Sequence, residues 1–203
     1  MNGRWKQNCH LVGDQDGNAL IVDPGSDAEA ISESLDRRAW LPIAIINTHA
    51  HYDHVGAVTA LVERFRIPFY LHGDDADLLR RANLYRMVFD SPETIRVPEI
   101  THDLRDLSGE LKIGCFQLDV LHTPGHTPGS VCFRLGNYLF SGDTLMASGA
   151  GRTDLPGGDS GALRQSLDVL SSLDAKHELF GGHGRSVALG QALAAAIRAD
   201  ENA

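Results

Sequence analysis

Short apolar runs separated by polar turns dominate the first part of the chain and predict a series of strands. Apolar stretches at 8–12 and 19–22 flank the segment 14–17, which ends in Asp-Gly and is typical of a β-hairpin turn. The apolar run at 41–47 is continuous, which predicts a strand buried on both faces. A further short strand is predicted at 68–71.

Helical spacing of apolar residues follows these strands. Ser26, with Glu29 three residues later, is typical of a capping box that begins a helix. A clean helical period starts at Val55 and extends to Phe65. Other helices are predicted at 74–81, after a cap at Asp159 or Ser160 (with Leu163, Leu167 and Leu170), and around Leu189, Leu193 and Ile197.

The stretch 83–108 has no clear period and contains two prolines, so we expect a long functional or mobile connection. After it the pattern changes to short strands. These are predicted at Leu111–Ile113, Phe116–Leu121, Val131–Leu135, Tyr138–Phe140 and Glu178–Phe180.

Two successive sets of strands, each followed by helices, define the expected fold class. Helices on the outer faces of two packed sheets would cover the apolar surface of both. We therefore predict an α/β (α+β) protein, a four-layer αββα sandwich, formed by one domain over residues 1–203 without a separate C-terminal helical domain. A Rossmann sheet is the alternative, but no G-x-G-x-x-G follows the first strand.

Composition narrows the classes of partner. The chain has 203 residues and a formal net charge of −9, which disfavours nucleic acid because phosphate backbones are bound by basic side chains. No apolar run approaches the ~18 residues of a membrane-spanning helix, and the first residues lack the apolar core of a secretion signal. The chain has three cysteines and no CxxC pair, which favours a reducing, cytoplasmic compartment. We expect each cysteine to be a small buried side chain, at Cys9, Cys115 and Cys132.

Histidine is unusually frequent, with 10 in the chain, and several cluster directly after the strand at 41–47. Alternate side chains of an extended segment point to the same side, so His49 and His51 can face one cation. The turn into the next helix redirects Asp53 and His54, which predicts a second cluster beside the first. Unpaired, these polar groups would be costly to bury, so we expect a site here.

Three later segments each place one imidazole or carboxylate after a predicted strand. His126 lies in Gly-His-Thr-Pro-Gly, Asp143 in Ser-Gly-Asp, and His183 in Gly-His-Gly. Strand ends meet at a common edge when sheets pack. Imidazoles and carboxylates without a thiolate favour Zn, Fe or Mn over a structural zinc site of the cysteine type.

The four motifs H-x-H-x-D-H, G-H-T-P-G, S-G-D and G-H-G, in this order, resemble the metallo-β-lactamase superfamily over nearly the whole chain. The segment 151–159, which begins Gly-Arg-Thr-Asp, is similar to the glyoxalase II (hydroxyacylglutathione hydrolase) branch, although persulfide dioxygenases have a similar run.

The resemblance implies a site for two divalent metal ions, with Zn expected first and Fe or Mn as alternatives. It implies that one ion is held by His49, His51 and His126, the other by Asp53, His54 and His183, and that Asp143 bridges them. Asp53 and Asp143 would orient a metal-bridging hydroxide. Asp in place of Cys at the bridging position argues against a true β-lactamase.

A thiolate leaves without needing a proton, so a thioester requires no additional general acid. We therefore predict a metal-dependent thioester hydrolase acting on a small molecule, with S-D-lactoylglutathione as the substrate that the family suggests. Recognition of glutathione is open, because only 185–203 follow the last motif. Tyr52, Arg152 and Tyr85 are candidate substrate-binding residues; Arg152 could instead form an ion pair with Asp154.

Two other functions stay open. A mononuclear Fe(II) persulfide dioxygenase could use two His and one Asp of the same set. Alternatively, the chain could be a metal-binding or regulatory protein that hydrolyses no substrate. His122, four residues before His126, could compete for the metal. The sequence does not fix the oligomeric state.

Overall fold

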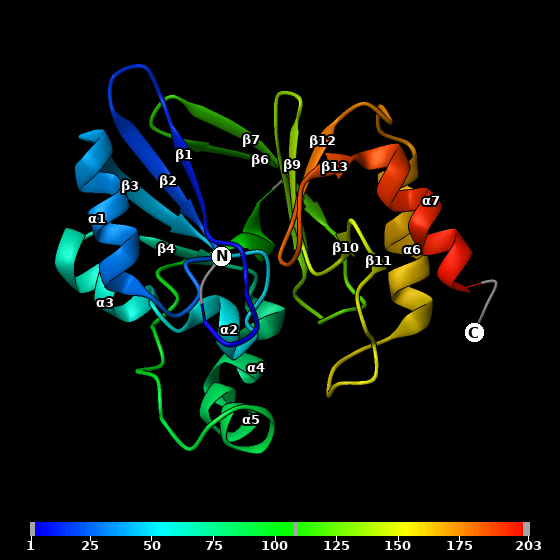
Figure 1. Ribbon diagram of the computed structural model, residues 1–203, viewed down its shortest axis with the longest axis horizontal. Helices are drawn as coiled ribbons and strands as arrows, with labels where there is room; N and C mark the ends of the chain where they lie inside the picture. The colour runs from blue at the N-terminus through cyan, green and yellow to red at the C-terminus, as the bar shows by residue number, and fades with distance from the viewer. Residues whose placement is uncertain (1–2, 108, 201–203) are drawn as a thin grey trace.

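A computed structural model describes residues 3–107 and 109–200. Two β-sheets pack face to face in the middle of the molecule, and helices cover the outer face of each sheet (Figure 1). This arrangement confirms the predicted four-layer αββα sandwich. None of the described helices is long and apolar enough to cross a membrane.

The first sheet contains five strands in sequential order, β1-β2-β3-β4-β5. The predicted hairpin is confirmed, because β1 and β2 pair antiparallel, whereas β2 to β5 run parallel. The strands are β1 (His10–Gly13), β2 (Asn18–Val22), β3 (Leu41–Ile46), β4 (Phe69–Leu71) and β5 (His102–Asp103).

The second sheet has the order β13-β12-β9-β8-β7-β6, and all of its pairs are antiparallel except β12 with β9. Its strands are β6 (Glu110–Ile113), β7 (Phe116–His122), β8 (Val131–Leu135), β9 (Tyr138–Gly142), β12 (Glu178–Gly181) and β13 (Val187–Ala188). A separate small ribbon, unpredicted, consists of β10 (Leu145–Met146) and β11 (Gly149–Ala150).

Helices α1 and α3 lie outside the first sheet, and α6 and α7 outside the second, while α4 and α5 extend from one end (Figure 1). The helices are α1 (Ala28–Arg38), α2 (Tyr52–Val55), α3 (Val58–Phe65), α4 (Ala76–Arg80), α5 (Ala82–Phe89), α6 (Ser160–Ser171) and α7 (Leu189–Asp200).

Among the described residues, the sheets divide the buried core into three apolar clusters, and β3 contributes to two of them. Ala44 and Ile46 belong to the apolar cluster between the two sheets, whereas Ile45 belongs to the cluster under α1 and α3. A third cluster, which includes Leu139 and Leu189, lies between the second sheet and its helices. Because β3 is covered on both faces, its sequence is apolar throughout rather than alternating.

Two predicted helix starts are wrong in detail. Asp27, not Ser26, caps α1, because its carboxylate accepts a hydrogen bond from the Ala30 N–H at 3.1 Å. The helix expected from Val55 is two helices, α2 and α3, interrupted at Gly56. The backbone carbonyl of Gly25 lies 3.0 Å from where a Cβ on Gly56 would be, so glycine permits this close approach.

The prediction that 83–108 forms one long connection is wrong, because α5 occupies its first part. Most apolar side chains of α5 face solvent and only Ala82 is fully buried, so the sequence has no clean buried stripe. The end of this stretch, Ser108, lies outside the described residues. Cys132 is buried as expected and Cys9 half-buried, but Cys115 is exposed.

Candidate metal centre

Ring nitrogens of three histidines, which two separate loops provide, lie close together. The loop after β3 provides His49 and His51, whose Nε2 and Nδ1 atoms lie 3.1 Å apart. The turn between β7 and β8 provides His126, whose Nε2 lies 2.9 Å from the same Nδ1 of His51. The structure therefore brings the first predicted group together.

The outer ring nitrogens of this group show which inner nitrogens are unprotonated. His126 Nδ1 lies 2.8 Å from the Arg152 carbonyl and must donate to it. Thr48 uses its only proton to donate to Asp23 at 2.7 Å, so its hydroxyl oxygen accepts from His49 Nδ1 at 3.0 Å. In the neutral forms of these two imidazoles, each Nε2 therefore turns a lone pair toward His51.

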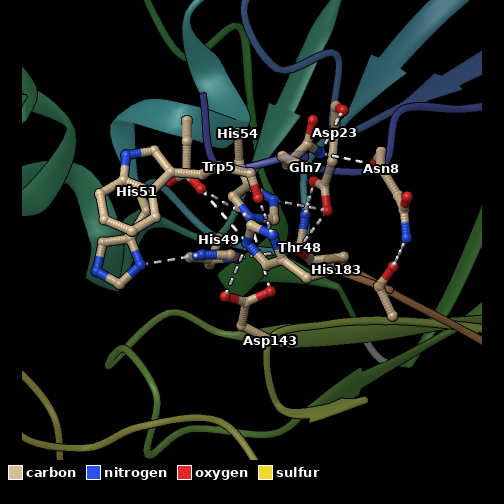
Figure 2. A network of polar contacts seen from close by, with 12 residues as sticks. Trp5, Gln7, Asn8, Asp23, Thr48, His49, His51, His54, Asp143 and His183 are labelled. Carbon is tan, nitrogen blue, oxygen red and sulfur yellow. Dashed lines mark hydrogen bonds and ion pairs between the residues drawn. The ribbon is translucent and has the colours of Figure 1, made fainter. Parts of the chain in front are cut away.

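The second predicted group gathers beside the first (Figure 2). His183 Nε2 lies 3.4 Å from the Asp53 carboxylate, and His54 Nε2 lies 3.8 Å from the same oxygen. His183 Nδ1 donates to the carbonyl of Trp5 at 2.9 Å, which fixes the orientation of its ring. The isolated β-bridge between Gln7 and His183 holds the amino-terminal segment at this position.

Asp143, at the end of β9, lies between the two groups. One carboxylate oxygen is 3.6 Å from His126 Nε2 in the first group and 3.5 Å from His183 Nε2 in the second. Its other oxygen is 3.6 Å from His54 Nε2. A single carboxylate is thus placed to reach two ions at once.

Burial disfavours a positive charge on two imidazoles of the first group, His49 and His51. The cost of charging a buried imidazole, reinforced by the neighbouring His126, lowers the pKa of His51 to about 3. Burial likewise lowers the pKa of His49 well below its usual range. In the second group burial also disfavours the charge of His54, but Asp53 and Asp23 outweigh it and raise the pKa of His54 to about 9.

These contacts fit bound cations better than any other occupant. His51 Nδ1 has at most one proton to donate, but the Nε2 atoms of both His49 and His126 lie within 3.1 Å of it, so hydrogen bonding satisfies these nitrogens less well than a cation between them would. Two buried atoms at the centre, His54 Nε2 and Asp143 Oδ1, have no hydrogen-bond partner among the described residues. Metal coordination would satisfy both.

Two buried carboxylates that the sequence analysis missed support the ligand loops. Asp23, directly after β2, accepts from the Thr48 N–H at 2.7 Å and lies 3.2 Å from His54 Nδ1. Asp75, after β4, accepts from the Ala50 N–H at 2.8 Å, the Thr127 hydroxyl at 2.9 Å and the Gly129 N–H at 2.6 Å. The available sequence signal was an acidic residue shortly after a buried strand.

The predicted substrate residues lie around a cavity of about 180 Å³ that opens onto the ligands, and Tyr52 and Tyr85 line it. Arg152 lines it too, but its guanidinium makes two hydrogen bonds of 2.7 Å to Asp154. The structure therefore supports the ion-pair reading of Arg152.

His122 does not join the centre. Its ring stacks on His72 at 4.2 Å, and its Nε2 donates to the Pro128 carbonyl at 2.9 Å. With Asp74 these two histidines form a separate group near the molecular surface. His122 is therefore not placed to compete for a metal held by His126.

The family model described as the metallo-beta-lactamase superfamily matches residues 2–183. The probable metallo-hydrolase YqgX of Bacillus subtilis is 38% identical over 176 residues, which cover 83% of this chain and 81% of that protein. The hydroxyacylglutathione hydrolase GloC of Haemophilus influenzae is 32% identical over 195 residues, which cover 92% and 90%.

Solved structures agree with this match. The crystal structure of the B3 metallo-beta-lactamase BLEG-1 superposes with a TM-score of 0.87 at 39% identity, covering 93% of this chain and 92% of that one. The crystal structure of TTHA1623 in a di-iron-bound form superposes with a TM-score of 0.84 at 38% identity, covering 94% and 93%.

Proposed function

The chain belongs to the metallo-β-lactamase superfamily, and from this premise we propose that it is a binuclear metal-dependent hydrolase of thioesters. In this proposal the seven converging side chains would hold the metal ions, and Asp143 is placed to reach both. We propose Zn²⁺ as the resident metal, with Fe or Mn as alternatives, because imidazole and carboxylate ligands accept all three. When bound, such a pair lowers the pKa of a shared water and polarises a carbonyl.

The protein's own contribution is to position this chemistry. Asp53 and Asp143 would accept hydrogen bonds from the attacking water and hold its oxygen toward the carbonyl carbon. The carbonyl of Arg152 and the hydroxyl of Thr48 fix the ring orientations of His126 and His49. Such outer contacts commonly orient metal ligands.

The choice of a thioester depends on the rest of the cavity wall. Apart from the proposed ligands, the residues that line it are aromatic or apolar, with Arg152 as the exception. Burial raises the pKa of the Tyr52 hydroxyl to about 12, which makes it a poor proton donor at neutral pH. A thiolate leaving group, with a pKa of about 8.5, departs without such a donor. This scarcity of acids carries the proposal.

Hydrolysis breaks the bond between the acyl carbon and sulfur, with the oxygen of water entering the acid and the proton going to the thiol or to solvent. The similarity to a hydroxyacylglutathione hydrolase supports this reaction class. S-D-Lactoylglutathione is therefore the first substrate to assay. The described residues 185–200 form β13 and α7, which pack on the sandwich, so we propose that this single domain supplies the whole site.

Metal removal tests the proposal directly. We expect chelated protein to lose at least about 1,000-fold in thioesterase kcat/KM, because the water and the carbonyl lose their activating charge. Two equivalents of Zn²⁺, Fe²⁺ or Mn²⁺ per chain should restore it. Thiol release, followed with a colorimetric thiol reagent, and metal content give the two readouts.

A panel of substrate classes provides the contrary outcomes. Oxygen uptake with a glutathione persulfide at one Fe per chain, without thioester turnover, would establish the dioxygenase alternative. Turnover confined to a β-lactam or a lactone would place the reaction in another hydrolase class. Full thioesterase activity in metal-free protein would exclude the metal mechanism.

A further inference from the structure

Apolar side chains form part of the wall of the cavity that the candidate metal ligands also line. Trp5, Leu78, Tyr85 and Phe89 line the same cavity as His51, together with Leu155 and Pro156. These side chains come from three separate parts of the chain. The amino-terminal segment provides Trp5, helices α4 and α5 provide the next three, and the loop before α6 provides the last two.

The cations near the cavity are already paired with carboxylates. Arg152 is bound by Asp154. The adjoining cavity of about 280 Å³, which shares Trp5 and Tyr52 with the first, is lined by two more arginines. Both of these, Arg4 and Arg86, lie within 3.6 Å of Asp90, and Arg86 also lies 3.2 Å from Glu93.

This pairing determines which substrates the wall can recognise. A carboxylate on the thiol carrier or the acyl group would have to share each arginine with a carboxylate of the protein. Its gain is small, because each guanidinium already has an acidic partner and exposed ion pairs contribute little. An uncharged chain meets no such competition.

The apolar surface continues outward from Phe89 along α5. The large side chains Leu84, Met87, Val88 and Phe89 are between 45% and 62% exposed, and Trp5 is 46% exposed. Contiguous exposed apolar surface at the mouth of a cavity typically marks a binding site. Trp5 and Phe89 belong both to the cavity wall and to this exposed surface. The surface can therefore contact the part of a substrate that extends away from the reacting carbon.

We propose that this site selects thioesters whose acyl group is an uncharged aliphatic or aromatic chain, which docks between Trp5, Tyr85 and Phe89. The proposal rests on the thioesterase function proposed above. In this proposal the acyl chain lies against these apolar side chains while the carbonyl faces the candidate ligands that line the same cavity. Affinity for the transition state then grows with the apolar area that the chain buries.

A series of acyl groups on one neutral thiol, N-acetylcysteamine, tests this. From acetyl through butyryl to hexanoyl, we expect kcat/KM of the metal-loaded protein to rise about two- to fourfold per methylene, as burial of a methylene predicts. Phe89→Ala should flatten this rise, because it removes apolar surface that the longer acyl chains would bury. Val169→Ala, which removes an exposed apolar side chain from α6 instead, is the matched control and should keep the full rise.

The outcomes separate this inference from the proposed function. If the acetyl thioester is hydrolysed but kcat/KM is flat with chain length, the apolar site is wrong and the thioesterase stands. A kcat/KM for S-D-lactoylglutathione more than tenfold above that of the hexanoyl thioester also overturns it. If no thioester is hydrolysed, the proposed function fails. A dimer whose dissociation accompanies Phe89→Ala, with chain-length independence, would assign the α5 face to a second copy.

Discussion

Asp143→Ala should reduce thioesterase kcat/KM by at least about 1,000-fold, equivalent to about 4 kcal/mol of transition-state stabilisation. The reason is its position between the two groups, within 3.6 Å of nitrogens from His126, His54 and His183. Its loss would leave each proposed ion one ligand short and would remove an acceptor for the attacking water. Metal content should fall below two equivalents per chain, measured by elemental analysis after dialysis.

Asp154→Ala is the appropriate comparison for this variant. Asp154 is an exposed carboxylate near the same cavity, and it pairs with the exposed guanidinium of Arg152. It is too exposed for the pair to contribute much to stability. We expect Asp154→Ala to retain both metal equivalents and kcat within about threefold. Asp143→Ala protein with two tightly bound ions and normal turnover would contradict the assignment of Asp143.

The positions of the site residues were predictable because the motifs stand at strand ends. His49 and His51 follow β3, Asp143 directly follows β9 and His183 follows β12, so the packing of two sheets brings them to one edge. All seven predicted side chains lie together, and their role as ligands stays a prediction. A short span of sequence around His49 contained most of the information.

The supporting carboxylates could not be predicted in this way. Asp23 contacts Thr48 across 25 residues, and Asp75 contacts Gly129 across 54, so no local spacing indicates either pair. Helix α5 escaped prediction for a different reason. Its exposed side chains include apolar ones, such as Met87 and Val88. The sequence therefore lacks the polar face by which a surface helix is recognised. The same feature that hid the helix supports its proposed contact with substrate.

The buried carboxylate of Asp75 leads to the second prediction, that Asp75→Asn weakens metal binding by the first group by about 10- to 100-fold. Asp75 is fully buried and accepts hydrogen bonds from both loops that carry this group. Ala50 lies between His49 and His51, and Thr127 directly follows His126. An asparagine amide would turn an N–H group toward one of the backbone N–H donors, so one loop would lose its anchor and move away from the other.

Asp74→Asn supplies the control, because Asp74 is the adjacent residue, is exposed, and pairs with His72 and Arg105, which lie outside both loops. Co²⁺ substitution gives the measurement, since its visible spectrum reports each coordination environment separately. We expect Asp75→Asn to lose the bands of the three-histidine group at Co²⁺ concentrations that still fill the group of Asp53, His54 and His183. Equal weakening of both environments, or a fall in thermal stability with unchanged Co²⁺ affinity, would show that Asp75 supports the fold in general rather than the position of these histidines.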